Sequence, residues 1–281
     1  MTDQQVVAHP NAVVSAEFAK LASGERIAKA AAALARNGIR SLLAATGADA
    51  RGLVRSLLVD GAEIYNNTSQ TLEAIGVADD IERSGRYQPL RLRLYRMDRE
   101  MQRHEMRTLA ASPDYVVGSV HALTEDGSLL IASASGSQLG PLVSGAGHVI
   151  LVIGAQKIVS DVTTGMRRIY EYCYPLEDAR ARRAYGVPSG VNNILIINKV
   201  ITADRVTAII VSERLWRQSG HWDLYRDNMF LIESEGQTFS LKPMNCPEST
   251  YIYRHALRSY RDLPLRVAEI GRLHRNERSG T

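Results

Sequence analysis

Residues 148–155 read HVILVIGA and residues 205–212 read RVTAIIVS, two continuous apolar runs of strand length. Runs of Val, Ile and Leu without polar alternation are typical of strands that are buried on both faces of a parallel sheet. The Asp126-Gly127 pair between two further runs predicts a hairpin turn and one antiparallel element. The further runs lie at residues 39–46, 62–66, 115–124, 128–134 and 191–198.

Helical segments separate these runs. Ser23 is a suitable N-cap, Glu25 places a carboxylate near the positive end of the helix dipole, and Gly38 can end the helix in the left-handed conformation. Longer helical segments are predicted over residues 90–112 and 162–186. Strands that alternate with helices predict an α/β domain, in which a mostly parallel sheet has helices on both faces.

The composition divides the chain into two parts. Of its 281 residues, 45% are hydrophobic and 23% are charged, which is typical of a folded soluble protein and excludes a disordered or collagen-like one. The net charge of +4 is too small to indicate nucleic-acid binding. Both tryptophans, Trp216 and Trp222, lie in the C-terminal part. This change predicts an α/β domain over residues 1–212 and a second unit over residues 213–281.

The sequence carries no sign of a membrane, a secretion route or a self-contained metal centre. No apolar run approaches the roughly 20 residues of a membrane-spanning helix, and no basic segment precedes an apolar core at the N-terminus. We therefore expect a cytoplasmic protein without a membrane partner. Cys173 and Cys246 are too few to hold an iron–sulfur cluster. No catalytic residue can be picked out, and His121 and Cys173 are predicted to pack in the interior.

Three loops rich in small polar residues follow predicted strands, at residues 66–69, 133–140 and 154–157. Ligands of open α/β sheets bind beyond the carboxyl ends of strands, where backbone N–H groups gather. The candidate ligand-binding residues are Thr68, Ser69, Ser135, Gly136, Ser137 and Lys157. The alternative interpretation is structural, with Thr68 and Ser69 as helix N-caps and the second loop as a tight turn.

Longer strings resemble the lactate-utilisation (LUD) domain family. They are SPDYVVGSVHALTEDGSLLIASASGSQLGPLVSGAGHVILVIGAQKIVSD, RRIYEYCYPLEDARARRAYG and VNNILIIN, and the resemblance extends over about residues 25–212. It implies a fold similar to the ribose-5-phosphate isomerase and CoA-transferase group. It also implies a part in the oxidation of L-lactate to pyruvate, beside iron–sulfur partner proteins that hold the clusters.

The same resemblance implies where a ligand binds. A phosphate- or CoA-type ligand is expected at the loops that match Thr68-Ser69, Glu125-Asp126-Gly127 and Ser135-Gly136-Ser137. Asp126 thereby joins the candidate residues, while the catalytic residues stay unknown. A non-catalytic module that binds such a ligand is the alternative function, and a homo-oligomer is one of the arrangements left open.

The C-terminal part, from Leu215 onward, resembles the catalytic core of threonyl-tRNA synthetase. The string LPLRVAEIGRLHRNE matches the second signature motif of class II synthetases. The resemblance implies that Arg275 holds the ATP α-phosphate and that Glu277 positions the adenine end. In KPMNCPE, it implies that Met244 lines the threonine pocket and that Cys246 is a zinc ligand. ATP and zinc are therefore implied for this segment alone.

This segment lacks parts of the synthetase pattern. The two histidines that complete the family's zinc site fall beyond residue 281, and RVTAIIVS occupies the place of the first motif. We expect an incomplete α+β class II fragment that does not fold cooperatively by itself. Threonine–tRNA ligase activity and tRNA binding are therefore not expected, although a fragment acting in translation is the alternative function.

Overall fold

The computed structural model describes residues 14–98, 100–212, 231–234 and 237–240. The chain divides into two units, residues 1–213 and 214–281, which are described separately. In the second unit, β11 (Leu231–Ser234) and β12 (Gln237–Ser240) form an antiparallel pair.

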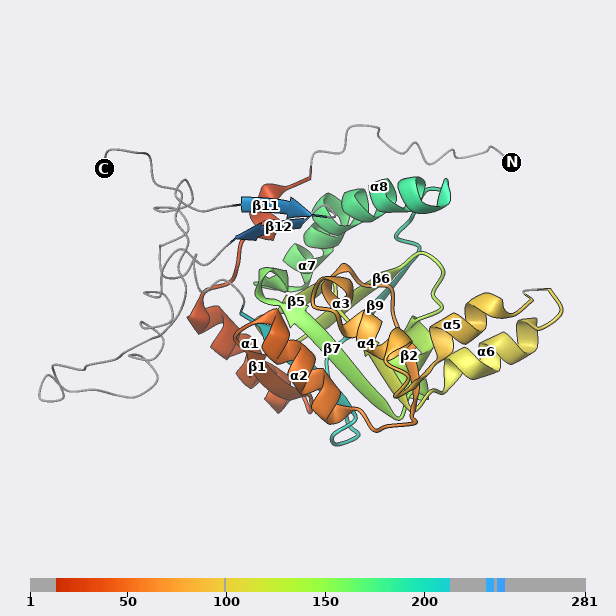
Figure 1. The fold of residues 1–281 in the computed structure, drawn as a ribbon. Coiled ribbons are helices and arrows are strands. Elements are labelled where there is room, and N and C mark those ends of the chain that lie inside the picture. The colour runs from red at the N-terminus through yellow and green to blue at the C-terminus, as the bar shows by residue number, and fades with distance from the viewer. Residues whose placement is uncertain (1–13, 99, 213–230, 235–236, 241–281) are drawn as a thin grey trace, which may run out of the picture. The chain divides into compact units, whose positions relative to one another are not determined.

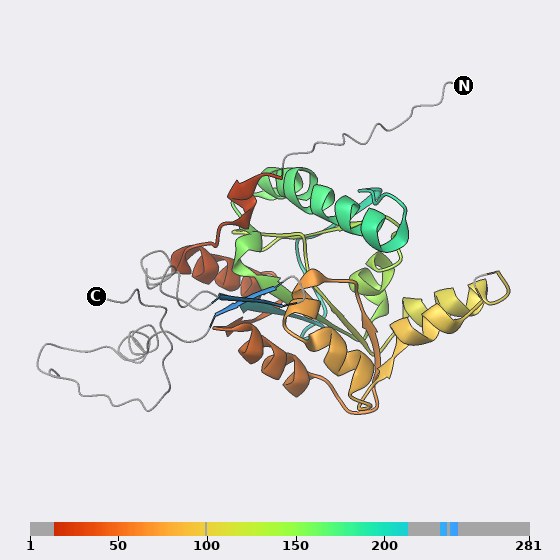
Figure 2. The same cartoon turned by 45° about the horizontal axis from the view of Figure 1, so that its top comes forward.

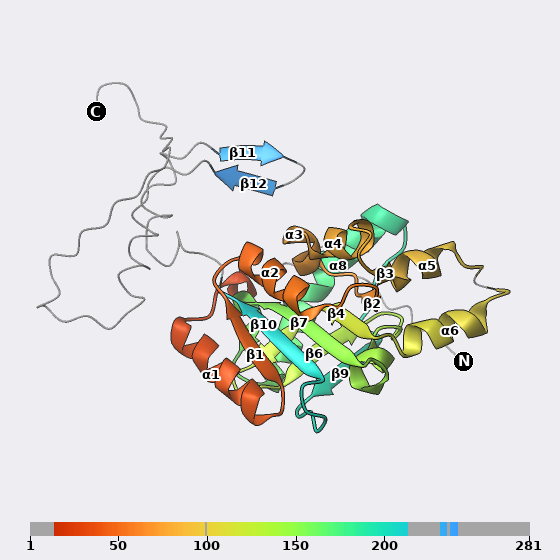
Figure 3. The same cartoon turned by 60° about the horizontal axis from the view of Figure 1, so that its bottom comes forward.

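The first unit is built on a six-stranded sheet in which every pairing is parallel. Figure 3 shows the strands of this sheet side by side. Residues 148–154 form a central strand of this sheet, and their side chains point alternately to its two faces. Leu151 packs in the core on one face, and Val152 packs in the core on the other. The predicted buried parallel strand at residues 148–155 is confirmed. In spatial order the strands are β1 (Arg40–Ala44), β10 (Val206–Val211), β7 (His148–Gly154), β4 (Tyr115–Gly118), β2 (Glu63–Asn66) and β3 (Gln88–Pro89).

The two faces of this sheet are covered differently (Figures 1 and 3). One face packs against α2 (Gly47–Leu57), α3 (Gln70–Ala74) and α4 (Val77–Arg83). The other face packs against α1 (Gly24–Arg36) and a second, smaller sheet. The prediction of helices on both faces is therefore right for one face and incomplete for the other.

The second sheet has four strands in the order β8–β5–β6–β9. The antiparallel hairpin predicted from Asp126-Gly127 is confirmed, and Gly127 has a φ of 88° in its turn. The strand predicted over residues 115–124 is wrong in one respect. It is two strands, because the chain leaves the six-stranded sheet after Gly118 and enters the second sheet at Ala122. The four strands are β5 (Ala122–Thr124), β6 (Leu129–Ser133), β8 (Ile158–Val159) and β9 (Asn193–Ile197).

A long helical segment follows β8 in the chain (Figures 1 and 2). The segment predicted over residues 162–186 is a continuous helical run of α7 (Val162–Arg168), a π-helical turn (Ile169–Cys173) and α8 (Tyr174–Tyr185). None of the described helices has both the length and the apolar character that a bilayer crossing demands.

The helix predicted over residues 90–112 is wrong, because it is two helices, α5 (Leu90–Arg96) and α6 (Arg103–Ala111). The Asp98 carboxylate accepts hydrogen bonds from the backbone N–H groups of Glu100 and Met101 at 2.8 and 2.9 Å. A carboxylate that binds nearby N–H groups competes with helical hydrogen bonding, so the chain turns here.

Both ends of α1 are as predicted. At its start Ser23 accepts a hydrogen bond from the Arg26 N–H, and after its end Gly38 takes the left-handed conformation, with a φ of 75°.

Candidate functional site

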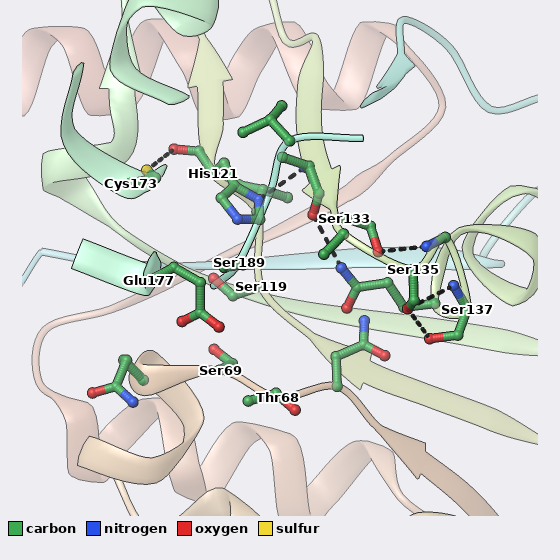
Figure 4. Close-up of a pocket in the computed structure, with 18 of the residues that line it drawn as sticks. Thr68, Ser69, Ser119, His121, Ser133, Ser135, Ser137, Cys173, Glu177 and Ser189 are labelled. Atoms are coloured by element: carbon green, nitrogen blue, oxygen red, sulfur yellow. Dashed lines mark hydrogen bonds between the residues drawn. The ribbon is translucent and has the colours of Figure 1, made fainter. Parts of the chain in front are cut away.

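The first unit contains a cavity of about 1410 Å³ (Figure 4). Part of its wall follows the carboxyl ends of three parallel strands, at Asn67 after β2, Ser119 after β4 and Lys157 after β7. This is the place where ligands bind in open α/β sheets. The loop after β6, the α7–α8 run and the α5–α6 pair complete the wall.

Six of the seven residues that the sequence singled out in this unit line the same cavity. They are Thr68, Ser69, Ser135, Gly136, Ser137 and Lys157. The seventh, Asp126, lies elsewhere. Its backbone carbonyl accepts from Asn37, and the neighbouring Glu125 is paired with Arg26 and Lys29 at 2.5 and 2.8 Å. These contacts hold the tip of the hairpin against α1 and against Asn37, the residue that follows α1. The structure therefore does not bring Asp126 to the cavity.

The hydroxyl residues of the two loops have local structural roles as well. Ser69 is the N-cap of α3, where its Oγ accepts from the Leu72 N–H at 3.4 Å. The Oγ atoms of Ser135 and Ser137 lie 3.0 Å apart in the loop after β6. Gly136 takes a φ of 77° there, a conformation that favours glycine. The N-cap interpretation is therefore confirmed for Ser69, and both loops still present hydroxyls to the cavity (Figure 4).

Lys157 is the basic group at the base of these loops. Its Nζ donates to the hydroxyls of Thr71 and Ser119 at 2.9 and 2.7 Å. The Ser119 hydroxyl must accept here, because it donates its own proton to the Val152 carbonyl at 2.5 Å. Burial, followed by the charge of Arg168, lowers the pKa of Lys157 from 10.5 to about 8. Lys157 is therefore largely charged at neutral pH, with one N–H left for a ligand.

Arg168 is a second cation, only 2% exposed. Its guanidinium donates to the backbone carbonyls of His121 and Gln156, lies 2.9 Å from the Cys173 Sγ, and stacks over Tyr172 at 5.0 Å. Within the described part of the chain, neither Arg168 nor Lys157 has a carboxylate within 4.0 Å. Buried charges are normally paired, so two unpaired cations at one cavity favour an anionic ligand.

His121 and Cys173 line this cavity, a role that the sequence did not predict (Figure 4). His121 lies between β4 and β5, and its Nδ1 accepts from the Ala132 N–H at 3.1 Å, so Nε2 carries the proton. Burial, with the charges of Lys157 and Arg168, lowers the pKa of His121 to about 3. Burial raises the pKa of the Cys173 thiol, against the opposing effect of Arg168. Both groups are therefore neutral at pH 7.

The whole wall is electropositive. Among the residues that the structure describes, Glu177 is the one carboxylate of this wall, and it pairs with Arg180 at 2.7 Å. Its basic side chains are Arg91, Arg107, Lys157, Arg168, Arg180 and Arg183. A surface with this excess of cations attracts anions and raises their local concentration.

A six-stranded parallel sheet with a cationic cavity at its carboxyl edge defines an α/β protein. The LUD domain matches residues 27–211, and the chain belongs to this family. Among solved structures, a DUF162 family protein from Deinococcus radiodurans is similar, with a TM-score of 0.44 and 12% identity; the match covers 69% of this chain and all of that one.

The C-terminal part is similar to a different family. Residues 230–281 match the class II core domain of tRNA synthetases (G, H, P, S and T). A stretch of 74 residues of the chain is 57% identical to the threonine–tRNA ligase of Caldanaerobacter subterraneus, and a stretch of the same length is 58% identical to that of Paraburkholderia phymatum. Each match covers 26% of this chain, and the chain spans only 12% of the length of each relative.

The residues predicted in the synthetase-like segment lie outside the described residues. They are Met244, Cys246, Arg275 and Glu277. Their roles in binding threonine, zinc and ATP stay predictions.

Proposed function

We propose that this chain is a lactate-utilisation protein of the cytoplasm that takes part in the oxidation of L-lactate to pyruvate. Two findings support the proposal: the chain belongs to the LUD domain family, and its cavity offers unpaired cations to an anion. L-lactate is a carboxylate, which Lys157 and Arg168 attract. The single observation that carries the proposal is family membership over residues 27–211.

The oxidation needs an electron acceptor. Converting L-lactate to pyruvate releases two electrons and two protons. The chain has two cysteines, whereas an iron–sulfur cluster usually takes four cysteine thiolates. We therefore place the clusters in iron–sulfur partner proteins, which take the electrons.

A reconstituted reaction tests this proposal. The full chain, its iron–sulfur partner proteins, L-lactate and an electron-accepting dye are combined, and dye reduction is followed together with pyruvate. We expect reduction only when all components are present, with D-lactate as the stereochemical control. Equal rates with this chain omitted would contradict the proposal.

A non-catalytic module for a phosphate- or CoA-type ligand is the second candidate function. The size of the cavity favours it, because about 1410 Å³ exceeds the usual range for drug-sized ligands and far exceeds what lactate fills. The further arginines of the wall, such as Arg107 and Arg183, suit several phosphates along one extended ligand.

This second function predicts a ligand effect that depends on the loop after β6. Coenzyme A and inorganic phosphate are expected to raise the melting temperature of the full chain. Ser135→Arg and Ser137→Arg should abolish this rise, because an arginine side chain fills the cavity where the loop faces it. Ser56→Arg, on the exposed surface of α2, is the matched control and should keep it. Equal rises in all variants would exclude binding at this loop.

We propose no aminoacylation by the synthetase-like segment. Threonine-dependent exchange between ATP and pyrophosphate, measured on the full chain, tests this point. Exchange above the rate without threonine would support the alternative, a fragment acting in translation with ATP and zinc.

A further inference from the structure

Asn67 is a buried residue of the cavity wall. It is 6% exposed, and among the described residues neither Nδ2 nor Oδ1 of its side-chain amide has a hydrogen-bond partner. Its backbone N–H does have one, the Val117 carbonyl at 2.9 Å. A buried amide left unsatisfied costs free energy, so such a group in a cavity wall points to a ligand.

The end of β4 contacts both Asn67 and Lys157. Asn67 packs over Gly118, where an added Cβ would come within 2.7 Å of its Nδ2. The next residue, Ser119, accepts a hydrogen bond from Lys157 Nζ at 2.7 Å. Gly118 thus leaves the space that the amide fills, and Ser119 holds the ammonium one residue further along.

Together the two side chains offer a cation, a hydrogen-bond donor and a hydrogen-bond acceptor. We infer that Lys157 and Asn67 form a subsite for a 2-hydroxycarboxylate. The Lys157 ammonium binds the carboxylate, the Asn67 Oδ1 accepts from the ligand hydroxyl, and Nδ2 donates to the hydroxyl oxygen. This inference rests on the proposed lactate function and names the residues that bind the substrate.

Close analogues of L-lactate separate the three contacts. Pyruvate keeps the carboxylate and an oxygen that accepts from Nδ2, but it cannot donate to Oδ1. Propionate keeps the carboxylate alone. A site built to bind a hydroxyl discriminates against ligands that lack it, because its own polar groups are then left unpaired.

The experiment measures dissociation constants of L-lactate, pyruvate, propionate and inorganic phosphate for the full chain by titration calorimetry. We expect L-lactate to bind about 10-fold more tightly than pyruvate or propionate. Asn67→Leu should remove this preference and leave propionate binding unchanged. Equal affinities in the unaltered protein, a preference that survives Asn67→Leu, or phosphate binding alone would overturn the inference.

The melting temperature separates a binding role of Asn67 from a structural one. Asn67→Leu replaces an unpartnered buried amide with an apolar side chain of similar size, so we expect a rise of about 2–4 °C. The control is Asn66→Leu. Asn66 also lines the cavity, and its Oδ1 has no partner among the described residues, but its Nδ2 donates to Glu82 at 2.7 Å, so its loss should lower the melting temperature. A fall with Asn67→Leu would make the amide structural and overturn the inference.

The outcome is independent of the dye-reduction test. The expected affinities without lactate-dependent dye reduction would reject the oxidation and keep the subsite. Dye reduction with no effect of Asn67→Leu on any affinity would keep the oxidation and reject the subsite.

Discussion

Replacing Arg168 with Ala is expected to lower the free energy of unfolding by about 3–5 kcal/mol. The guanidinium satisfies the buried carbonyls of His121 and Gln156, and these would be left without a donor. The substitution also removes the guanidinium stacked over the Tyr172 ring and leaves a cavity beside that ring. Urea denaturation of the two proteins measures the difference.

The neighbouring Arg167 provides the matched control for this prediction. Its side chain is 52% exposed and pairs with Glu171 and Glu17 at the surface. Exposed ion pairs contribute little, so Arg167→Ala should cost far less than Arg168→Ala. Similar losses from the two variants would contradict the prediction that the buried Arg168 contributes more to stability than the exposed Arg167.

Replacing Lys157 with Met is expected to weaken anion binding at least about 100-fold. The same change should raise the free energy of unfolding at pH 7 by about 1 kcal/mol. Holding the ammonium in the fold costs about 3 kcal/mol, since its pKa is lowered from 10.5 to about 8. The two lost bonds, to Thr71 and Ser119, offset about 2 kcal/mol of that gain.

The pH dependence of stability checks the sign of this argument. Between about pH 8 and pH 10.5 the folded protein has released the Lys157 proton while the unfolded chain still holds it. Raising the pH through this window therefore removes the cost of the buried charge, so the contribution of Lys157 to stability becomes less unfavourable. Anion affinity should change in the opposite direction, falling above pH 8.

Denaturation curves at pH 7, 8, 9 and 10 measure this dependence. The slope that Lys157 contributes should be missing in Lys157→Met and present in the control Lys199→Met, which alters an exposed lysine. Identical slopes in all three proteins, or undiminished anion binding by Lys157→Met, would contradict the assignment of Lys157 as the cation of the site.

Apolar pattern was sufficient to predict the centre of the fold. HVILVIGA is buried on both sides, so its composition alone marked it as an inner parallel strand. YVVGSVHALT looks equally continuous, yet it crosses between two sheets at residues 119–121. Ser119 and His121 are the polar residues of this crossing, but Val120 between them is buried, and Val117 and Leu123 on either side are fully buried in their different sheets. Pairing partners distant in the chain decide where such a run is divided.

The cavity was only partly predictable for a related reason. Loops after strands could be found from turn residues, and this brought Thr68, Ser135 and Lys157 to notice. Arg168 and Cys173 lie within a helical run, where an arginine is most often solvated and a cysteine most often packs in the interior. Their approach to the cavity follows from how that run lies on the second sheet, which the sequence alone does not show.

The π-helical turn at Ile169–Cys173 sets the phase of α8. Arg168 lies just before the turn, and Glu177 lies in the first part of α8, nine residues after Arg168. Both side chains line the cavity. In a regular α-helix, positions nine residues apart lie on opposite sides. The wider turn rotates the chain less per residue, and α-helical spacing there would rotate α8 by roughly a quarter of a turn. Five residues thereby select which side chains of α8 belong to the site.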